Sequence, residues 1–451
     1  MEKGETNIAV IGAGLTGLTT AYYLKKHGFK VQVFEKMDRA GGVIHTHREN
    51  GFIFESGPNT GSMSRYEAAE LFEDLAGDCT LEIADENAKD RWILKGGKWH
   101  SLPSGLLGGI TTPLFSFSDK LRLLGEPFRK KGTNPEETIA DLVRRRMGKT
   151  FLHYAVDPFI SGVYSGDPEK LVTKYAIPKL WQLEQDYGSF IGGTIKKSKI
   201  PKTERDKKAS REVFSAVGGM DNLVKALVKN IGTENIHLNW DKQVFPTGKG
   251  GFEIGGQNFS HVISTVGAYQ LVNVFPFLPA DKVEKINKMN YARVTQVALG
   301  FRKWEGIPIK SFGGLIPSKE KHDILGILFM SSFMKKRAPQ GGALLAVFLG
   351  GVRRPEITGY SDDQIMTLVK KEVQNLMGLN KFNPDVVKIF RYPHAIPQYS
   401  FESKDKLEAI TILENDFPGL LLAGNIRDGI GMADRIKQGR NIADQLAAKI
   451  K

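Results

Sequence analysis

Asn7-Ile-Ala-Val-Ile-Gly-Ala-Gly-Leu-Thr-Gly17 is the stretch that decides the fold of this chain. Its apolar first half predicts a short strand ending at Ile11, and the apolar spacing after it predicts a helix that Gly28 ends. Residues 31–34 predict a second strand, and Glu35 stands at its end. A strand, G-x-G-x-x-G, a helix, and a second strand followed by an acid are typical of a βαβ dinucleotide-binding unit.

Each glycine of this motif has a mechanical role. Gly12 permits the tight turn, Gly14 lets backbone approach a pyrophosphate, and Gly17 lets helix and strand pack closely. The helix N-terminus supplies unpaired N–H groups and a partial positive charge for the phosphates. We expect Glu35 to accept hydrogen bonds from the adenosine ribose, which argues against the 2′-phosphate of NADP. The predicted contacts are Gly12, Ala13, Gly14, Leu15, Thr16, Gly17, Glu35 and Lys36.

The composition is that of an ordinary globular protein of several domains. In the 451 residues, 41% are hydrophobic and 25% are charged, which excludes wholesale disorder. The single cysteine, Cys79, excludes an internal disulfide framework and a cysteine-based metal cage. The apolar stretch at residues 7–24 holds too many glycines and threonines for a membrane span and lacks a signal-cleavage site. We therefore expect a cytoplasmic protein that touches a membrane only peripherally.

Two stretches after the first motif indicate which dinucleotide cofactor the chain binds. Glu35 is followed by Arg39-Ala-Gly-Gly42 and then by Phe52-Ile-Phe-Glu-Ser-Gly-Pro58. These residues resemble the FAD-dependent oxidoreductases of the amine oxidase and protoporphyrinogen oxidase superfamily. The resemblance implies that the first element runs along the diphosphate and ribityl chain and that the second passes close to the isoalloxazine. It assigns to the flavin Arg39, Gly42, Val43, Gly57, Pro58, Asn59 and Thr60.

The far end of the chain agrees with this resemblance. Residues 420–423 predict a buried strand, and Gly429-Ile-Gly-Met-Ala-Asp434 opens a helix that runs to the C-terminus. The resemblance points that helix at the N1/O2 edge of the flavin, where its N–H groups would stabilise negative charge. A purely structural turn is the alternative. The remaining flavin contacts implied are Val244, Thr265, Tyr392, Gly424, Ile430, Gly431, Met432 and Ala433. FAD would be held noncovalently, because the C-terminal region has no cysteine.

The middle of the chain points to a substrate. Residues 159–171 and 178–189, with Arg91 ahead of Leu102-Pro103, resemble the protoporphyrinogen/coproporphyrinogen oxidase family much more closely than the amine oxidases. The resemblance implies that protoporphyrinogen IX or coproporphyrinogen III is dehydrogenated in haem biosynthesis. A hydride would pass from a methylene bridge to flavin N5, with oxygen as acceptor and hydrogen peroxide as product. A quinone is the alternative acceptor, while the lack of a second G-x-G-x-x-G argues against NAD(P).

The reaction implied needs an apolar slot and a charge that orients a carboxylated ring. Arg91 is the predicted propionate clamp, because a guanidinium meets a carboxylate with two parallel hydrogen bonds. The resemblance adds Gly162 for close approach to the ring, with an opposite wall formed by Phe312, Gly313 and Leu315. An ordinary ion pair and an ordinary core cluster are the alternatives for these residues. No motif predicts a catalytic side chain, and we expect no metal, since His45 and His47 lack a third ligand.

The predicted fold class is α/β, with a Rossmann-type FAD-binding domain, a mixed α/β substrate domain and an α-helical insertion domain. We expect the FAD-binding domain at residues 1–80, 212–268 and 400–451, the substrate domain at 81–100 and 269–399, and the helical domain at 101–211. Within the last, Asp167-Pro168 predicts a helix start.

Charge is concentrated between Lys196 and Arg211, where eight basic and two acidic residues give +6 of the chain's +13. This run predicts either a solvated, mobile loop or docking on an anionic membrane surface. Nucleic acid is not an expected partner, because no aromatic residues interleave these charges. A homodimer is open. A flavin amine oxidase and a non-catalytic binder on the same fold remain the rival functions.

Overall fold

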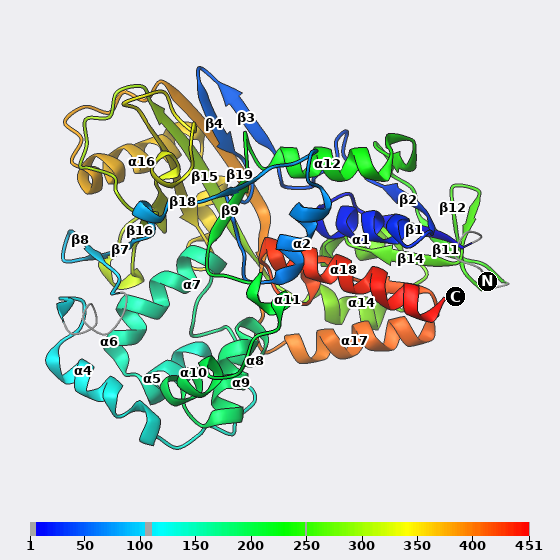
Figure 1. The fold of residues 1–451 in the computed structure, drawn as a ribbon, viewed down its shortest axis with the longest axis horizontal. Coiled ribbons are helices and arrows are strands. Elements are labelled where there is room, and N and C mark those ends of the chain that lie inside the picture. The colour runs from blue at the N-terminus through cyan, green and yellow to red at the C-terminus, as the bar shows by residue number, and fades with distance from the viewer. Residues whose placement is uncertain (1–5, 104–110, 249, 451) are drawn as a thin grey trace.

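A five-stranded parallel sheet forms the centre of one end of the molecule (Figure 1). The computed structural model describes residues 6–103, 111–248 and 250–450. The strand order is β10 (Ile236–His237), β2 (Lys30–Phe34), β1 (Asn7–Ile11), β14 (His261–Ser264) and β20 (Leu420–Leu422). Strands from the two ends of the chain, β1 and β20, thus flank β14, and the predicted strands at 31–34 and 420–423 are present.

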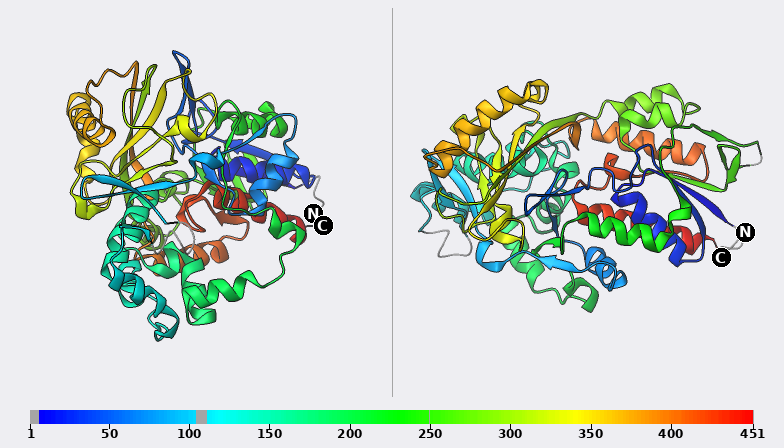
Figure 2. Two further views of the ribbon diagram at one scale, coloured as in Figure 1. Left: turned by 60° about the vertical axis from the view of Figure 1, so that its left-hand side comes forward. Right: turned by 90° about the horizontal axis from the view of Figure 1, so that it is seen from above.

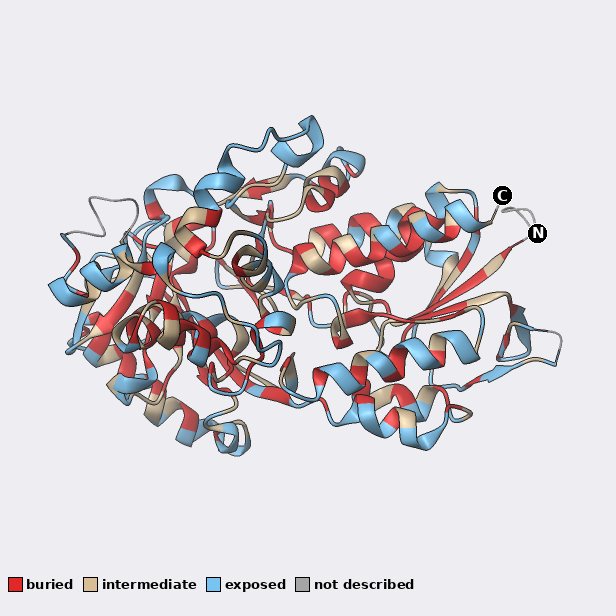
Figure 3. Ribbon diagram, turned by 90° about the horizontal axis from the view of Figure 1, so that it is seen from below, coloured by how far each residue is buried: buried red, intermediate tan, exposed pale blue. Residues whose placement is uncertain are grey.

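Helices cover both faces of this sheet because successive side chains of a strand point to opposite faces. Ile8 and Val10 of β1 join one core with α1 (Leu15–Lys26), α2 (Tyr66–Asp74), α12 (Asp221–Ile231) and α18 (Met432–Lys449). Ala9 and Ile11 join the other core with α13 (Leu271–Val274), α14 (Ala280–Asn287) and α17 (Ser403–Asp416). Figure 3 shows the buried faces of α1 and α18 in red. This doubly wound arrangement confirms the predicted α/β fold class.

A seven-stranded mixed sheet lies at the other end of the molecule, as both views of Figure 2 show. Its order is β19 (Val386–Pro397), β15 (Tyr291–Phe301), β18 (Ala343–Gly350), β17 (Gly326–Leu328), β16 (Gly313–Leu315), β7 (Arg91–Lys95) and β8 (Lys98–Ser101). Only β16 and β7 pair in parallel. The helix α16 (Asp362–Met377) packs on one face, and α15 (Met330–Phe333) packs on the other.

Three small sheets complete the strands. They are the hairpin β3 (Thr46–Glu49) and β4 (Phe52–Glu55), the group β5 (Gly61–Ser62), β9 (Val213–Ala216) and β6 (Leu81–Ile83), and the group β11 (Val244–Pro246), β12 (Phe252–Ile254) and β13 (Gln257–Phe259). The strand β6 pairs with β9, so the chain crosses between regions close to residue 83. The predicted domain boundaries stay a prediction.

A helical region, cyan to green in Figure 1, follows β8 in the sequence and precedes β9. Its helices are α4 (Phe117–Leu124), α5 (Ile139–Arg146), α6 (Lys149–Phe151), α7 (Asp157–Tyr164), α8 (Thr173–Ala176), α9 (Pro178–Tyr187), α10 (Phe190–Ser198) and α11 (Glu204–Lys207). A π-helical turn, Leu152–Val156, precedes α7. Among the described residues, no helix combines the length and the apolar character that crossing a bilayer requires.

A buried ion cluster holds this helical region together. The Arg146 guanidinium lies 2.6 Å from carboxylate oxygens of Glu126 and of Glu184, and all three side chains are fully buried. The Ser189 hydroxyl also donates to Glu126 at 2.7 Å. The carboxylates therefore exchange water for several donors at once, which lowers the pKa of both Glu126 and Glu184 against the opposing effect of burial.

Two local predictions in the helical region are wrong. Asp167 does not begin a helix: its carboxylate accepts the Glu169 N–H at 3.1 Å within a turn and accepts from Arg353 at 2.8 Å. Asp-Pro suits the start of a turn as well as that of a helix, and the distant arginine holds the turn here.

The basic run is not a free loop either. Its first residues end α10, and residues 204–207 form α11. Arg205 pairs with Glu70 at 2.7 Å, and Lys208 pairs with Glu73 at 2.5 Å, both carboxylates being on α2. Partners that lie far away in the sequence therefore order this segment.

We predict that Arg146→Ala destabilises the protein by about 3–5 kcal/mol, because it leaves two buried carboxylates without their cation. Denaturant unfolding of the holoprotein measures this change. The matched control is Arg144→Ala on the same helix, whose partly exposed pairs with Asp141 and Glu169 should contribute about 0–1 kcal/mol. Equal losses for the two variants would contradict a structural role for the buried cluster.

Candidate functional site

The glycine motif folds as its spacing predicts. Gly12 has a φ of +99°, and its N–H donates to the Phe34 carbonyl at 2.7 Å. A Cβ on Gly17 would lie 1.9 Å from the Gly12 carbonyl oxygen, whereas a Cβ on Gly14 would meet no atom within 4 Å. Gly14 is also the N-cap of α1, and no side chain caps this helix. Within the described residues, no side chain therefore caps the N–H groups at the start of α1, and no atom lies where a side chain of residue 14 would begin.

Glu35 closes the loop from the second strand. Its carboxylate accepts the Ala13 N–H at 2.7 Å and the Met37 N–H at 2.9 Å, and only 9% of the residue is exposed. Lys36, in contrast, is exposed and pairs with exposed Asp241 at 3.1 Å. The acid therefore lies against the turn where the motif predicts a ribose, while its contact with the ribose stays a prediction.

A second glycine turn lies directly on the first. The Gly41 N–H donates to the Ala13 carbonyl at 2.8 Å, and a Cβ on Gly42 would approach the Gly14 Cα to 3.2 Å. Arg39 donates to the carbonyls of Gly42 (2.8 Å) and Ile44 (3.0 Å), which fixes the shape of this turn. The two glycine turns predicted from separate motifs are therefore neighbours.

The turn at residues 55–60 packs against the same place. A Cβ on Gly57 would lie 1.9 Å from the Val43 carbonyl oxygen, and Val43 itself is 57% exposed. The Tyr392 hydroxyl, from β19, donates to the Ser56 carbonyl. Pro58 and Thr60 are half-buried, and Asn59 is buried. The exposed face of Val43 is consistent with its predicted contact to a bound group.

The Glu55 carboxylate, at the start of this turn, binds groups from β3 and from the residue before α12. Its carboxylate accepts the Met220 N–H at 2.9 Å and the Thr46 hydroxyl at 2.7 Å. Burial outweighs these donors and raises the pKa of Glu55 to about 7. Sequence reasoning did not single out this anchor, because its partners come from β3 and from the start of α12.

The C-terminal segment brings a second helix end to the glycine loops. Both α1 and α18 run from the middle of the molecule towards the end where the termini lie (Figure 1). Gly431 is the N-cap of α18, and no side chain caps this helix either. Gly439 of α18 lies where a Cβ would meet the Thr16 carbonyl oxygen at 2.8 Å, so the two helices touch.

The residues at or just after the ends of β1, β14 and β20 contact one another. Thr265, just after β14, has its hydroxyl 3.0 Å from the Ile11 carbonyl oxygen, and Gly424 lies on Thr265 with a φ of +83°. Val244 is fully buried beside Phe34 in the second core. Ile430 is half-buried, and Met432 and Ala433 are buried at the start of α18.

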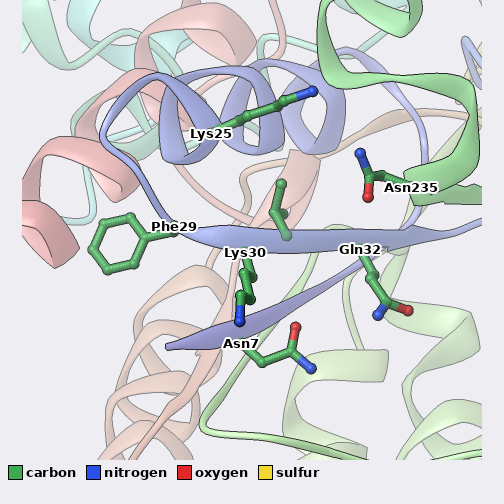
Figure 4. A pocket seen from close by; sticks show the side chains of 7 residues that line it. Asn7, Lys25, Phe29, Lys30, Gln32 and Asn235 are labelled. Atoms are coloured by element: carbon green, nitrogen blue, oxygen red, sulfur yellow. The ribbon is translucent and has the colours of Figure 1, made fainter. Parts of the chain in front are cut away.

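These features fit a bound dinucleotide. Two helix N-termini without a side-chain cap present partial positive charge, and a Cβ on Gly14 would meet no described atom within 4 Å, so the backbone there is open to a close approach. The buried hydroxyl of Thr16, in the first turn of α1, has no hydrogen-bond partner among the described residues. A pocket at the starts of β1 and β2, lined by Lys25, Lys30, Gln32 and Asn235, lies at the opposite end of these strands (Figure 4). It is therefore not the dinucleotide site.

The predicted substrate residues gather on the seven-stranded sheet and α7. The Arg91 guanidinium lies 5.2 Å from the centre of the Phe312 ring and makes no ion pair with a described residue. Desolvation lowers the pKa of Arg91, although the residue remains exposed to solvent. Gly313 pairs with Arg91 across β16 and β7. The alternative of an ordinary ion pair for Arg91 is therefore absent within the described residues.

The arrangement of Gly162 differs from the prediction. A Cβ on Gly162 would lie 2.4 Å from Cδ2 of Leu315, so these residues are direct neighbours rather than opposite walls. The missing side chain lets α7 lie on β16. Phe159 and Val163, on the same face of α7, are 45% and 44% exposed. Together they extend the apolar wall that includes Leu315.

Comparisons with known proteins identify the family of this chain. A family profile for flavin containing amine oxidoreductase matches residues 15–447. The chain belongs to this family. FAD, held noncovalently, is accordingly the cofactor of this flavoprotein. The resemblance seen in the sequence is thereby confirmed.

Its relatives are named for porphyrinogens. Protoporphyrinogen oxidase 2, chloroplastic/mitochondrial, of Arabidopsis thaliana is 32% identical over 97% of this chain and 93% of its own length. Coproporphyrinogen III oxidase of Bacillus subtilis (strain 168) is 25% identical over 98% of this chain and 97% of its own. The crystal structure of a candidate protoporphyrinogen oxidase from Exiguobacterium sp. 255-15 covers 99% of both chains, with a TM-score of 0.81 and 20% identity. The last likeness shows the fold alone.

Several residues that hold the flavoprotein's site together carry no sequence signal. Asp157, at the start of α7, accepts from Arg353 and from the Ser318 N–H, both at 2.7 Å, and thereby fixes α7 on the sheet. Arg65 pairs with Asp434, in the first turn of α18, at 2.8 Å. An acid near a helix start is a known local pattern, but its distant partners are visible only in the fold. His45 and His47 stack edge to face 4.4 Å apart within an aromatic cluster.

Two glycine substitutions should separate FAD contact from folding. Gly14→Ala should leave the melting temperature unchanged, because φ is −74° and a Cβ meets no described atom, yet weaken FAD binding by at least about tenfold. Gly17→Ala should lower both stability and FAD binding, since its Cβ overlaps the Gly12 carbonyl. Thermal unfolding of the apoproteins and FAD titration measure the two effects. FAD binding by Gly14→Ala as tight as that of the natural chain would remove Gly14 from the diphosphate site.

Proposed function

We propose that this flavoprotein oxidises a porphyrinogen, protoporphyrinogen IX or coproporphyrinogen III, to the porphyrin in haem biosynthesis. The observation that carries this proposal is the unpaired guanidinium of Arg91 beside the apolar wall of Phe312 and α7. Relatives of 32% and 25% identity that are named for these two substrates support it. Bound FAD supplies the two-electron acceptor, so the protein needs to position a substrate and exclude water.

The side chains have separable tasks in this reaction. Arg91 binds a propionate with two parallel hydrogen bonds and so orients the ring. Phe312, Leu315 and the exposed face of α7 contact the macrocycle and keep water from it. The first turn of α18, which no described side chain caps, would stabilise negative charge on the reduced flavin.

Oxygen is the proposed final acceptor. The chain carries a single G-x-G-x-x-G, so a second nucleotide would lack its characteristic loop. Stoichiometric formation of hydrogen peroxide during turnover supports oxygen, whereas turnover that requires an added quinone contradicts it.

The direct test of the proposed function offers both porphyrinogens and a polyamine to the purified holoprotein. We expect a gain of porphyrin fluorescence with at least one porphyrinogen, and no turnover with the polyamine. The ratio of kcat/KM for the two porphyrinogens identifies the substrate. Oxidation of the polyamine alone would replace this proposal with an amine oxidase.

We also propose that the protein binds an anionic membrane surface through α4. The apolar residues Phe117, Leu121 and Leu124 follow one face of this helix and are 75%, 52% and 65% exposed, and nearby Phe128 is 91% exposed. Exposed apolar side chains that gather in one patch on a protein surface indicate a site that binds a partner or a membrane. Lys120, Arg122, Arg129, Lys130 and Lys131 lie beside this patch in the sequence and supply attraction to anionic lipid, while Glu126 in the same stretch is buried and pairs with Arg146. Lys196, Lys197, Lys199, Lys202 and Arg211, which make no ion pair with described residues, can add to it.

Arg91→Ala should raise the KM for the porphyrinogen by about ten- to a hundredfold, because a charge-assisted hydrogen-bonded pair is lost. FAD content should not change, since Arg91 contacts none of the glycine turns. Steady-state kinetics and the flavin absorption spectrum measure these quantities. Lys98→Ala, an exposed cation on the adjoining strand β8, is the matched control and should behave as the natural chain. An unchanged KM in Arg91→Ala would remove this residue from the substrate site.

The double substitution Phe117→Ser and Phe128→Ser should reduce co-sedimentation with vesicles that contain anionic lipid and leave activity in solution intact. High salt should weaken the remaining binding. Phe245→Ser, an exposed phenylalanine on β11 at the opposite end of the molecule, is the control. Undiminished sedimentation of the double variant would show that α4 is not the contact.

A further inference from the structure

A lysine is buried without a carboxylate partner behind the loop that leads into α18. Lys406, on α17, is 1% exposed, and its Nζ lies 4.4 Å from the centre of the Tyr399 ring and 3.3 Å from Sδ of Met289. No ion pair joins it to a described residue. Burying an ammonium against an aromatic face and a thioether is costly, because neither replaces the water that the charge loses. A methionine or leucine would fill this position more stably.

Tyr399 connects this lysine to the loop of residues 425–429, the flavin loop, which leads into α18. Its hydroxyl lies 3.0 Å from the Asn425 carbonyl oxygen and 3.1 Å from that of Gly429, so both ends of the loop accept from one group. Its own carbonyl accepts the N–H of Val172, at the start of α8, at 3.0 Å. Tyr399 is therefore joined to the flavin loop and to the helical region at once.

The loop held by Tyr399 sets the position of the uncapped end of α18. Gly429 is followed by Ile430 and by Gly431, the N-cap of that helix. Arg435 of α18 donates to the Gly424 carbonyl, which holds the loop from its other side. A movement of the Tyr399 hydroxyl would thus move the first turn of α18.

We propose that Lys406 is a positioning residue for FAD: its ammonium, held against the Tyr399 ring, fixes the tyrosine that holds residues 425–429 and so aims α18 at the flavin. A cation beside an aromatic face is attracted to it only while it is charged. The protonated form of Lys406 should therefore be the form that favours bound FAD. This inference rests on the flavin site and does not depend on which substrate is oxidised.

The charge of Lys406 is poised near neutral pH. Desolvation lowers the pKa of Lys406 to about 7, and Asp428 of the loop opposes this shift. The Tyr399 ring lies against the ammonium, and the groups that act on Tyr399 are Arg435, Asp428 and Tyr164. Glu402 and Asp405 of the lysine's own helix are exposed. If FAD favours the ammonium form, FAD binding raises this pKa by linkage. The affinity for FAD is then highest below pH about 7 and falls as the pH rises through that value.

Titration of the apoprotein with FAD on both sides of neutral pH tests this inference. The natural chain should bind FAD several-fold more weakly above neutral pH than below it. Lys406→Met should bind weakly at every pH without that dependence, and Lys406→Arg, which stays charged, should bind tightly at every pH. Lys404→Met, an exposed lysine of the same helix, should retain the natural pH dependence. A Lys406→Met protein with the natural affinity or the natural pH dependence would overturn the proposal.

Tyr399→Phe tests the same contact if Lys406→Met does not fold. It keeps the ring that meets the ammonium and removes the hydroxyl that holds the loop, so the charge of Lys406 no longer acts on the loop, and FAD binding should weaken about tenfold below neutral pH and lose most of its pH dependence. Binding as tight as that of the natural chain would show that Tyr399 does not position α18. Both titrations use FAD alone, so their failure is distinguishable from failure to oxidise a porphyrinogen.

Discussion

The structure depends on two helix N-termini that are left without side-chain caps at the same place. The N-cap residues of α1 and α18 are glycines, Gly14 and Gly431, so within the described part of the chain no side chain caps the first N–H groups of either helix. A single parallel sheet makes this convergence, because β1 and β20 lie on either side of β14 and each leads into one of the helices. Anionic or electron-rich groups of FAD are what such paired helix ends can satisfy.

On the substrate side, the apolar face of α7 and the charge of Arg91 stay exposed. Asp157 and Arg353 clamp α7 to the seven-stranded sheet, while Gly162 allows it to lie on Leu315. This fixed contact leaves the apolar face at Phe159 and Val163 exposed and leaves the Arg91 charge without a protein partner. The exposed apolar face and the cation without a carboxylate partner are both explained if an oily, carboxylated ring covers them.

The local sequence was sufficient to predict those elements that depend only on the spacing of apolar residues and the positions of glycines. The strand, glycine turn and helix at residues 7–26 and the strand before α18 follow from apolar period and glycine position, and both are present. Prediction failed where a distant partner decides the outcome. Asp167 forms a turn because Arg353 reaches it, and the basic run is ordered because acids of α2 pair with it. Lys406 gave no signal at all, since a lysine in an amphipathic helix is normally exposed.

Hydrogen exchange measured with and without FAD tests the convergence of the two helix ends most directly. Backbone amides at residues 15–17 and 432–434 have no side-chain cap, so in the apoprotein they should exchange quickly for residues in helices. We predict that FAD slows exchange in both segments together, even though more than four hundred residues separate them in the sequence. Protection of the first segment with no change in the second would contradict a single cofactor held between α1 and α18.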